Sequence, residues 1–361
     1  MTRSGKRWRI PCTVLLAVAF KLSAQPLTPW QTHLPQTNAN TTNHFRGLCA
    51  VDHNIIWASG TAGTFLTTTN GGDTWRVGKV QGAHELDFRD VEAVDSQTAW
   101  LLSSGDGPQS RIYKTTDAGR QWTLQFQNEN PRAFFDALAF WDARHGIALS
   151  DPVDGRFLLL TTTNGGTTWT PIQAALPAAL PNETAFAASG TCLVVQGQSH
   201  VWFGTGGATR ARVFRSTDRG RTWSVSNTPL LAGADSAGIF SLAFRDERNG
   251  AAIGGNYKKP ETTTRNFAFT QDGGVTWHNR DGKFPSGFRS AVAWVRAADN
   301  QWLLVAVGTS GSDILKPSWS WRKLDNENHN TLSIARFDRS AIWAAGPKGR
   351  IARLLHLDPY R

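Results

Sequence analysis

Three arginines occupy matching places in the sequence. Each follows a phenylalanine at the start of an apolar segment, and they are Arg46, Arg89 and Arg289. A guanidinium group binds carboxylates and phosphates through paired, charge-assisted hydrogen bonds. Three such groups around one opening would bind an anionic group or an acidic peptide. The alternative is structural, with each arginine paired to an aspartate or a backbone carbonyl of a neighbouring unit.

Two aspartates accompany these arginines. Asp90 follows Arg89, and Asp136 takes the matching position in another unit. Two carboxylates across a cleft are what glycoside hydrolysis requires. Aspartates at the starts of strands also commonly cap turns or face water. A glycan-cleaving or glycan-binding protein is therefore the alternative to a binding surface without catalytic activity.

A third group of charges falls in the segment HGIALSDPVDGRF, residues 145–157. Pro152 and Gly155 favour a bend within it. We expect Asp151 and Arg156 to project from this bend at one face of the molecule, where loops carry binding residues. They complete the set of candidate binding residues.

Other catalytic patterns are not met. A sialidase requires an arginine cluster, a tyrosine with a carboxylate partner and a general acid. The chain has only three tyrosines, and its single Arg-Ile-Pro motif lies at residues 9–11, inside the expected leader. The nine histidines and three cysteines are dispersed, without the spacing of metal ligands. We therefore predict no catalytic residue, no metal and no cofactor.

The elements that position the candidate residues follow from a repeat, Ser/Thr-x-Asp/Asn-x-Gly-x-x-Trp, which we call the Asp box. Its Asp or Asn accepts backbone hydrogen bonds and its glycine takes a positive φ, so each copy predicts a hairpin turn. The tryptophan begins the next strand and fills the wedge between neighbouring sheets. The paired positions are Asn70 and Trp75, Asp117 and Trp122, Asn164 and Trp169, Asp218 and Trp223, and Asp272 and Trp277.

The spacing of the Asp boxes gives the size of the unit. Their tryptophans are separated by 47, 47, 54 and 54 residues, about the length of a four-stranded propeller blade. A degenerate unit ends near Trp321, and paired apolar runs complete a count of seven units. The expected blades span about 46–80, 88–127, 134–173, 185–227, 239–280, 288–325 and 331–356.

The last unit has too few residues for its outermost strand. The segment 27–35 carries Trp30 and is interpreted as that strand, paired beside the one that ends near Leu355. This pairing would close the ring and remove two exposed sheet edges. The predicted fold is all-β, a single seven-bladed propeller of four-stranded antiparallel blades over residues 25–361.

Residues 1–24 have a basic start, an apolar stretch and small residues at the end, the form of a cleaved secretory signal. We therefore expect a periplasmic or secreted protein. The net charge of +10 falls to +5 without this leader, and the remaining charges are scattered, so nucleic acid is not an expected partner. Cys49 and Cys192 fall in distant blades and are not expected to form a disulfide. We expect a monomer.

Several segments together resemble the photosystem II stability/assembly factor-like propellers, an Asp-box (BNR-repeat) family with bacterial members. They are the box copies, FRGLCAVD, FRDVEAVD, IIWASG, AIWAAG and GPKGRIARL. The resemblance covers about residues 27–356. It implies a non-catalytic assembly or stability platform for a protein or peptide partner, which in photosynthetic members is a membrane-protein assembly intermediate. It also implies an arginine-lined surface, which Arg46, Arg89 and Arg289 would match.

Overall fold

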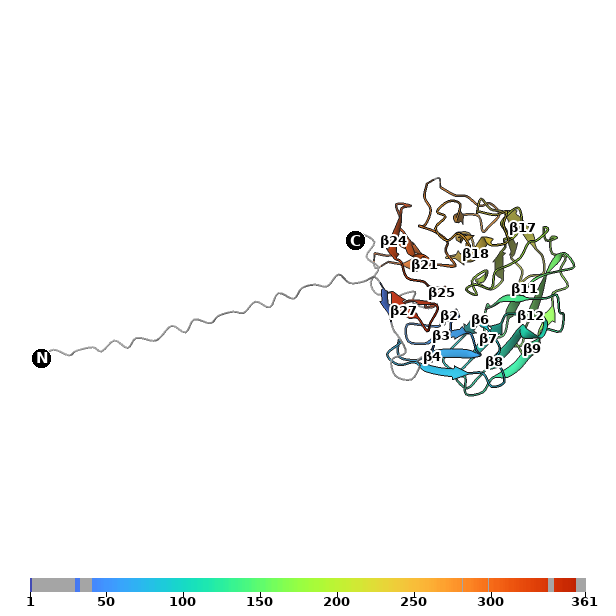
Figure 1. The fold of residues 1–361 in the computed structure, drawn as a ribbon, viewed down its shortest axis with the longest axis horizontal. Coiled ribbons are helices and arrows are strands. Elements are labelled where there is room, and N and C mark those ends of the chain that lie inside the picture. The colour runs from blue at the N-terminus through green and yellow to red at the C-terminus, as the bar shows by residue number, and fades with distance from the viewer. Residues whose placement is uncertain (2–29, 33–40, 281, 298, 337–340, 355–361) are drawn as a thin grey trace.

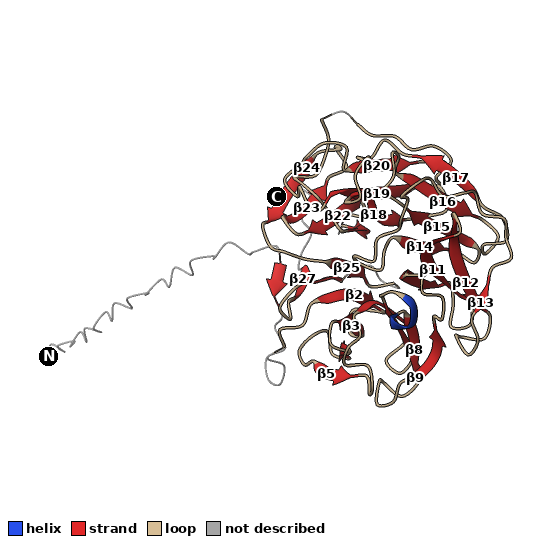
Figure 2. Ribbon diagram, turned by 45° about the vertical axis from the view of Figure 1, so that its right-hand side comes forward, coloured by secondary structure: helices blue, strands red, loops and turns tan. Residues whose placement is uncertain are grey.

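Seven antiparallel β-sheets stand around a central axis and form a ring (Figure 1). The computed structural model describes residues 1, 30–32, 41–280, 282–297, 299–336 and 341–354. Within these residues the only helix is a single 3-10 turn, η1 (Gly107–Gln109), drawn in blue in Figure 2. None of the described helical structure is long and apolar enough to cross a membrane. The prediction of an all-β, seven-bladed propeller is confirmed.

The first strands of neighbouring blades contact one another, which places them around the axis. Blade one contains β2 (Phe45–Ala50), β3 (Ile56–Gly60), β4 (Thr64–Thr68) and β5 (Arg76–Lys79). Blade two contains β6 (Phe88–Ala93), β7 (Ala99–Ser103), β8 (Arg111–Thr115) and β9 (Thr123–Gln127). Blade three contains β10 (Phe135–Phe140), β11 (Gly146–Val153), β12 (Arg156–Thr162) and β13 (Thr170–Pro171).

The second half of the ring repeats this arrangement. Blade four contains β14 (Leu193–Gln196), β15 (His200–Gly204), β16 (Arg212–Ser216) and β17 (Ser224–Asn227). Blade five contains β18 (Ala237–Phe244), β19 (Gly250–Asn256) and β20 (Phe267–Thr270). Blade six contains β21 (Ala291–Arg296), β22 (Trp302–Gly308), β23 (Gly311–Leu315) and β24 (Trp321–Asp325). Blade seven contains β25 (Thr331–Ile334), β26 (Ile342–Ala345), β27 (Ile351–Leu354) and β1 (Trp30–Thr32).

The ring closes as the sequence predicts. Strand β1 is antiparallel to β27, with Trp30 opposite Leu354 and Thr32 opposite Ala352. The two strands lie side by side in Figure 1, at the edge of blade seven. Strands from the two ends of the chain therefore complete one sheet.

The Asp-box segments form tight hydrogen-bonded turns. In blade two, the amide of Gly119 donates to the Thr115 hydroxyl at 2.8 Å, and the amide of Gln121 donates to the Asp117 carboxylate at 2.9 Å. The box tryptophan then packs edge-on against blade one, with Trp122 and Trp57 ring centroids 6.2 Å apart. The turn thus orients an aromatic ring into the wedge between two blades.

Tryptophans on the second strands of blades one, two and four donate hydrogen bonds to a neighbouring blade. Trp100 is fully buried and its indole N–H donates to the carbonyl of Gly165, in the Asp box of blade three, at 3.0 Å. Trp202 makes the same bond to Gly273 of blade five at 2.7 Å. A buried indole needs such a partner. These bonds therefore fix the angle between adjacent blades.

Blade five departs from the four-stranded plan. Its sheet has three strands, and the fourth place is taken by one isolated bridge between Phe269 and His278. The outer edge of blade five is consequently short.

Candidate functional site

β-Bulges at the starts of the inner strands position the candidate residues. The register passes from Phe45 to Gly47 in blade one and from Phe88 to Asp90 in blade two, so Arg46 and Arg89 fall outside the pairing. The same shift leaves Asp136 unpaired in blade three. A bulge bends the strand and redirects the extra side chain. Arg46, Arg89 and Asp136 thus occupy one structural position around the axis, whereas Arg289 precedes β21 and lies outside a bulge.

Arg46 and Arg89 lie close together at the upper opening, the end of the ring where the inner strands begin. Burial lowers the pKa of Arg46, the charge of Arg89 lowers it further, and Asp87 partly opposes both. Arg89 keeps 31% of its side chain exposed and forms an ion pair with Asp87 at 2.8 Å. Arg46 and Arg89 therefore lie near each other where β2 and β6 begin.

Arg289 does not present its charge there. Its side chain is fully buried, and its Nε donates to the Asp313 carboxylate at 2.7 Å. Its two other nitrogens donate to the carbonyl of Phe288 and to the hydroxyls of Ser286 and Ser310. The prediction of three arginines at the opening is corrected at this position, because a carboxylate of the same blade binds the third one.

The two candidates on either side of the β11–β12 turn, Asp151 at the end of β11 and Arg156 at the start of β12, have different surroundings. Asp151 is half-buried and accepts the backbone N–H of Ala185 at 2.8 Å, and desolvation raises its pKa to about 7. Arg156 is exposed and donates to the carbonyl of Leu176 at 2.7 Å. The expectation that both side chains project at one face holds for Arg156 and is wrong for Asp151, which turns inward.

Residues 185–191, which we call the axial plug, cross the ring ahead of β14. The Ser189 hydroxyl donates to the carbonyl of Ser290 in blade six at 2.9 Å. Thr331 of blade seven donates to the carbonyl of Ser189 at 3.0 Å, and Thr191 donates to the Ser241 hydroxyl of blade five at 2.7 Å. These partners belong to the opposite half of the ring from blades two and three. The plug therefore closes the axial passage.

Three aspartates hold the other side of the plug. Asp151 accepts from Ala185, and the backbone N–H of Ala187 lies near enough to Asp136 to oppose the rise that burial causes in the pKa of its carboxyl. Gly190 touches the Asp90 carboxyl, and a Cβ on this glycine would come within 2.2 Å of its Oδ1. The carboxyls thus follow the plug along its length.

Burial controls the protonation of these aspartates. It raises the pKa of Asp90 to about 7 and that of Asp136 well above its usual value, with the charge of Asp151 adding to the second shift. Asp90 also accepts the amides of Val91 and Leu138, both at 2.8 Å. Only 5% and 1% of the surfaces of Asp90 and Asp136 are exposed, so both carboxyls are buried beside the plug.

Aromatic side chains line the upper opening across from the arginines. Phe186 of the plug stacks on Phe240 at 3.9 Å, and Phe240 occupies the bulge of blade five. Phe240 also packs edge-on against Tyr257, which is 46% exposed. The plug residue that follows Phe186 reaches one of the arginines, because Arg89 donates to the carbonyl of Ala187. The opening is therefore cationic on one side and aromatic on the other.

The sequence did not reveal the plug or the aromatic side. The only signal for the plug is the run of small residues AASG, which makes the fourth unit a looser copy of the repeat. Across the described ranges, no group of three or more His, Cys, Asp or Glu side chains is placed to hold a metal ion. Cys49 and Cys192 are both buried and free.

These features define a closed seven-bladed β-propeller with a plugged axis. No family model and no curated protein matches the chain. Among solved structures it resembles YCF48 bound to D1 peptide, with a TM-score of 0.60, 14% identity, and coverage of 93% of this chain and 99% of the other. It also resembles YCF48 from Cyanidioschyzon merolae, with a TM-score of 0.58, 15% identity and coverage of 91% and 98%.

A third similar structure is the WD40 propeller domain of Doa1, with a TM-score of 0.56, 12% identity, and coverage of 91% of this chain and 98% of the other. YCF48 is a photosystem II assembly factor, so the resemblance expected from the sequence is confirmed for the fold. At these identities the similarity defines the fold alone.

Proposed function

We propose that this protein is a non-catalytic platform that binds a peptide or protein partner at the upper opening. The observation that carries this proposal is the pairing of Arg46 and Arg89 with an aromatic wall across a plugged axis. Because the plug supplies a floor, a ligand binds on the opening and does not pass through it. A guanidinium group recognises a carboxylate, and Tyr257 offers a flat, exposed apolar surface.

The cationic and aromatic sides of the opening indicate which chemical groups the partner carries. An acidic side chain or a chain carboxylate would bind the arginines, while a neighbouring apolar side chain would pack on Phe186 and Tyr257. The structure of YCF48 with D1 peptide supports a peptide ligand for this fold. By analogy, we propose a membrane-protein assembly intermediate as the source of the peptide.

We also propose that residues 1–24 direct the protein to the periplasm or the cell exterior. The basic, apolar and small-residue regions of the leader support this location. Residues 2–29 lie outside the described part of the chain.

A peptide array tests the platform. The mature protein is applied to peptides in which an acidic residue adjoins an apolar one, and each retained peptide is titrated by fluorescence anisotropy. An Arg46→Ala/Arg89→Ala variant should bind about tenfold more weakly or worse, the loss typical of removing interface arginines. Arg221→Ala, which removes an exposed arginine of blade four, is the matched control. Equal affinity of wild type and double variant would reject this site.

A further inference from the structure

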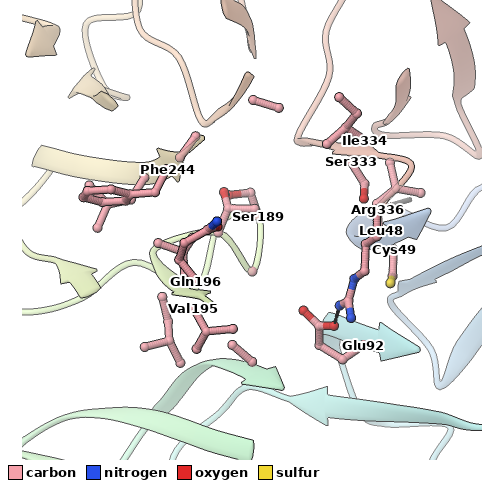
Figure 3. A pocket seen from close by; sticks show the side chains of 18 of the residues that line it. Leu48, Cys49, Glu92, Ser189, Val195, Gln196, Phe244, Ser333, Ile334 and Arg336 are labelled. Carbon is pink, nitrogen blue, oxygen red and sulfur yellow. Dashed lines mark hydrogen bonds and ion pairs between the residues drawn. The ribbon is translucent and has the colours of Figure 1, made fainter. Parts of the chain in front are cut away.

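A second opening lies at the other end of the axis, where the inner strands end. It leads into a pocket of about 390 Å³ lined by all seven inner strands, which we call the axial pocket (Figure 3). Ser189, Gly190 and Thr191 of the plug form part of its lining. The pocket is therefore closed toward the arginines, and its volume falls in the range of small-molecule sites.

One wall of the axial pocket carries opposite charges side by side. Glu92 of β6 and Arg336, which follows β25, form an ion pair. Their side chains remain 19% and 36% exposed. Asp90 also lines this wall, and the charge of Arg336 acts on it. The wall therefore presents the Glu92 carboxylate and the Arg336 guanidinium group to the interior, with the buried Asp90 carboxyl behind them.

The facing wall is apolar. Figure 3 shows Val195 and Phe244 across the pocket from Glu92 and Arg336. Leu242 and Val292 also line the pocket. An apolar surface of this kind favours an aliphatic or aromatic group, because burying it removes apolar area from water.

A ligand with a single charge fits this arrangement poorly. An anion would meet the Glu92 carboxylate, and a cation would meet the Arg336 guanidinium, since the two are in contact. A ligand carrying both charges satisfies both groups at once, and a desolvated charge is tolerated only when it is paired. Its remaining apolar part would face Val195 and Phe244.

We propose that the axial pocket binds a small zwitterion, namely a free amino acid with an apolar side chain. Its ammonium group binds the Glu92 carboxylate and its carboxylate binds the Arg336 guanidinium. Its side chain lies against Val195 and Phe244. This site is on the opposite end of the axis from Arg46 and Arg89, so it does not depend on the peptide platform.

Isothermal titration of the mature protein with L-leucine, L-valine and L-phenylalanine tests the proposal. At least one amino acid should give saturable binding. For that amino acid, the amide, which lacks the carboxylate, and the N-acetyl derivative, which lacks the ammonium, should each bind at least about tenfold more weakly. Absence of binding by all three amino acids, or equal binding of either derivative, would overturn the site. A dipeptide that binds more tightly would overturn the free amino acid as ligand.

Three variants locate the binding. Glu92→Gln and Arg336→Gln should each weaken binding at least about tenfold. Gln196→Trp places a large side chain in the pocket without altering a charge, and it should abolish amino-acid binding. This variant tests the site even if the two charge variants fold poorly. Glu327→Gln breaks the ion pair with Arg350 outside the pocket and should leave affinity unchanged. Unchanged affinity in Glu92→Gln, Arg336→Gln and Gln196→Trp would place the ligand elsewhere.

Discussion

Thr331 donates a hydrogen bond to the carbonyl of Ser189 at 3.0 Å, although 142 residues separate the two in the chain. Thr331 begins the inner strand of the last blade and Ser189 belongs to the axial plug. Both are buried. Contacts of this kind make the plug an integral part of the ring, and they also create the floor of each axial opening.

The contact between Gly190 and Asp90 predicts that the plug does not tolerate a side chain. Gly190→Ala should lower the free energy of unfolding, because its Cβ would clash with Asp90 and its φ is +74°. Gly82→Ala is the matched control, with a φ of +73° and nothing within 4 Å of the added carbon. Urea unfolding should show Gly190→Ala to be less stable than Gly82→Ala by about 1–3 kcal/mol, the usual cost of overpacking. Equal losses would mean that backbone strain alone acts at both sites.

The buried aspartates predict a stability that depends on pH. Burial raises the pKa of Asp90 to about 7, so the folded state holds this proton more tightly than the unfolded state does. Its stabilising contribution is complete below pH 4 and is lost as pH rises toward 7, by at most about 1.4 kcal/mol per pH unit. His329 acts in the opposite sense, because burial lowers its pKa to about 4 and stability falls below pH 6.5.

Asp90→Asn separates these contributions. Urea unfolding is measured between pH 4.5 and 8. As pH rises, the midpoint urea concentration of the variant should increase relative to that of wild type, because only wild type loses the stabilising contribution of a protonated Asp90. Asp73→Asn, at an exposed turn, should run parallel to wild type at every pH. A constant difference between Asp90→Asn and wild type would contradict the raised pKa.

The buried pair of Arg289 and Asp313 predicts a large stability loss when one partner is removed. Arg289→Met would leave the Asp313 carboxylate buried without its cation and should cost about 3–5 kcal/mol in urea unfolding. Arg289→Met/Asp313→Leu should recover part of that loss, because no isolated charge remains. Arg132→Ala, which breaks the exposed pair with Asp154, should cause no measurable change. A similar effect of all three variants would show that the buried charge is not the cause.

Burial of Asp90 and Asp136 predicts the absence of glycoside hydrolysis. The mature protein should release no chromophore from a panel of aryl glycosides at pH 5, 6 and 7. A commercial glycosidase, assayed on the same substrates, is the positive control. Turnover that disappears in Asp90→Asn or Asp136→Asn would overturn the non-catalytic function and restore the alternative.

The repeat makes the fold predictable because every blade needs the same local groups. A box such as Thr115 to Trp122 contains its own hydrogen-bond partners and its own wedge ring, so the sequence reveals both the turn and the period. The closure by β1 follows from counting strands. The three-stranded blade five was not foreseen, since its Asp box is intact and only the residues after Trp277 leave the sheet.

The site was only partly predictable, because its contacts are distant in sequence. One position of the sequence repeat holds Arg46, Arg89 and Arg289. Only Arg289 is bound by a buried carboxylate, that of Asp313, which keeps its side chain away from the opening. The plug depends on partners 101 and 142 residues away from Ser189, which no local pattern reveals. The binding role of Arg46 and Arg89 stays a prediction.

The pairing of β1 with β27 also determines how the molecule bears tension. Trp30, at the start of β1, lies opposite Leu354, at the end of β27, and three residue pairs join the two strands within the described part of the chain. Force applied between the chain ends would load these hydrogen bonds one after another, as in a zipper, rather than all together. Tension between the two chain ends would therefore first reach the contact that closes the ring.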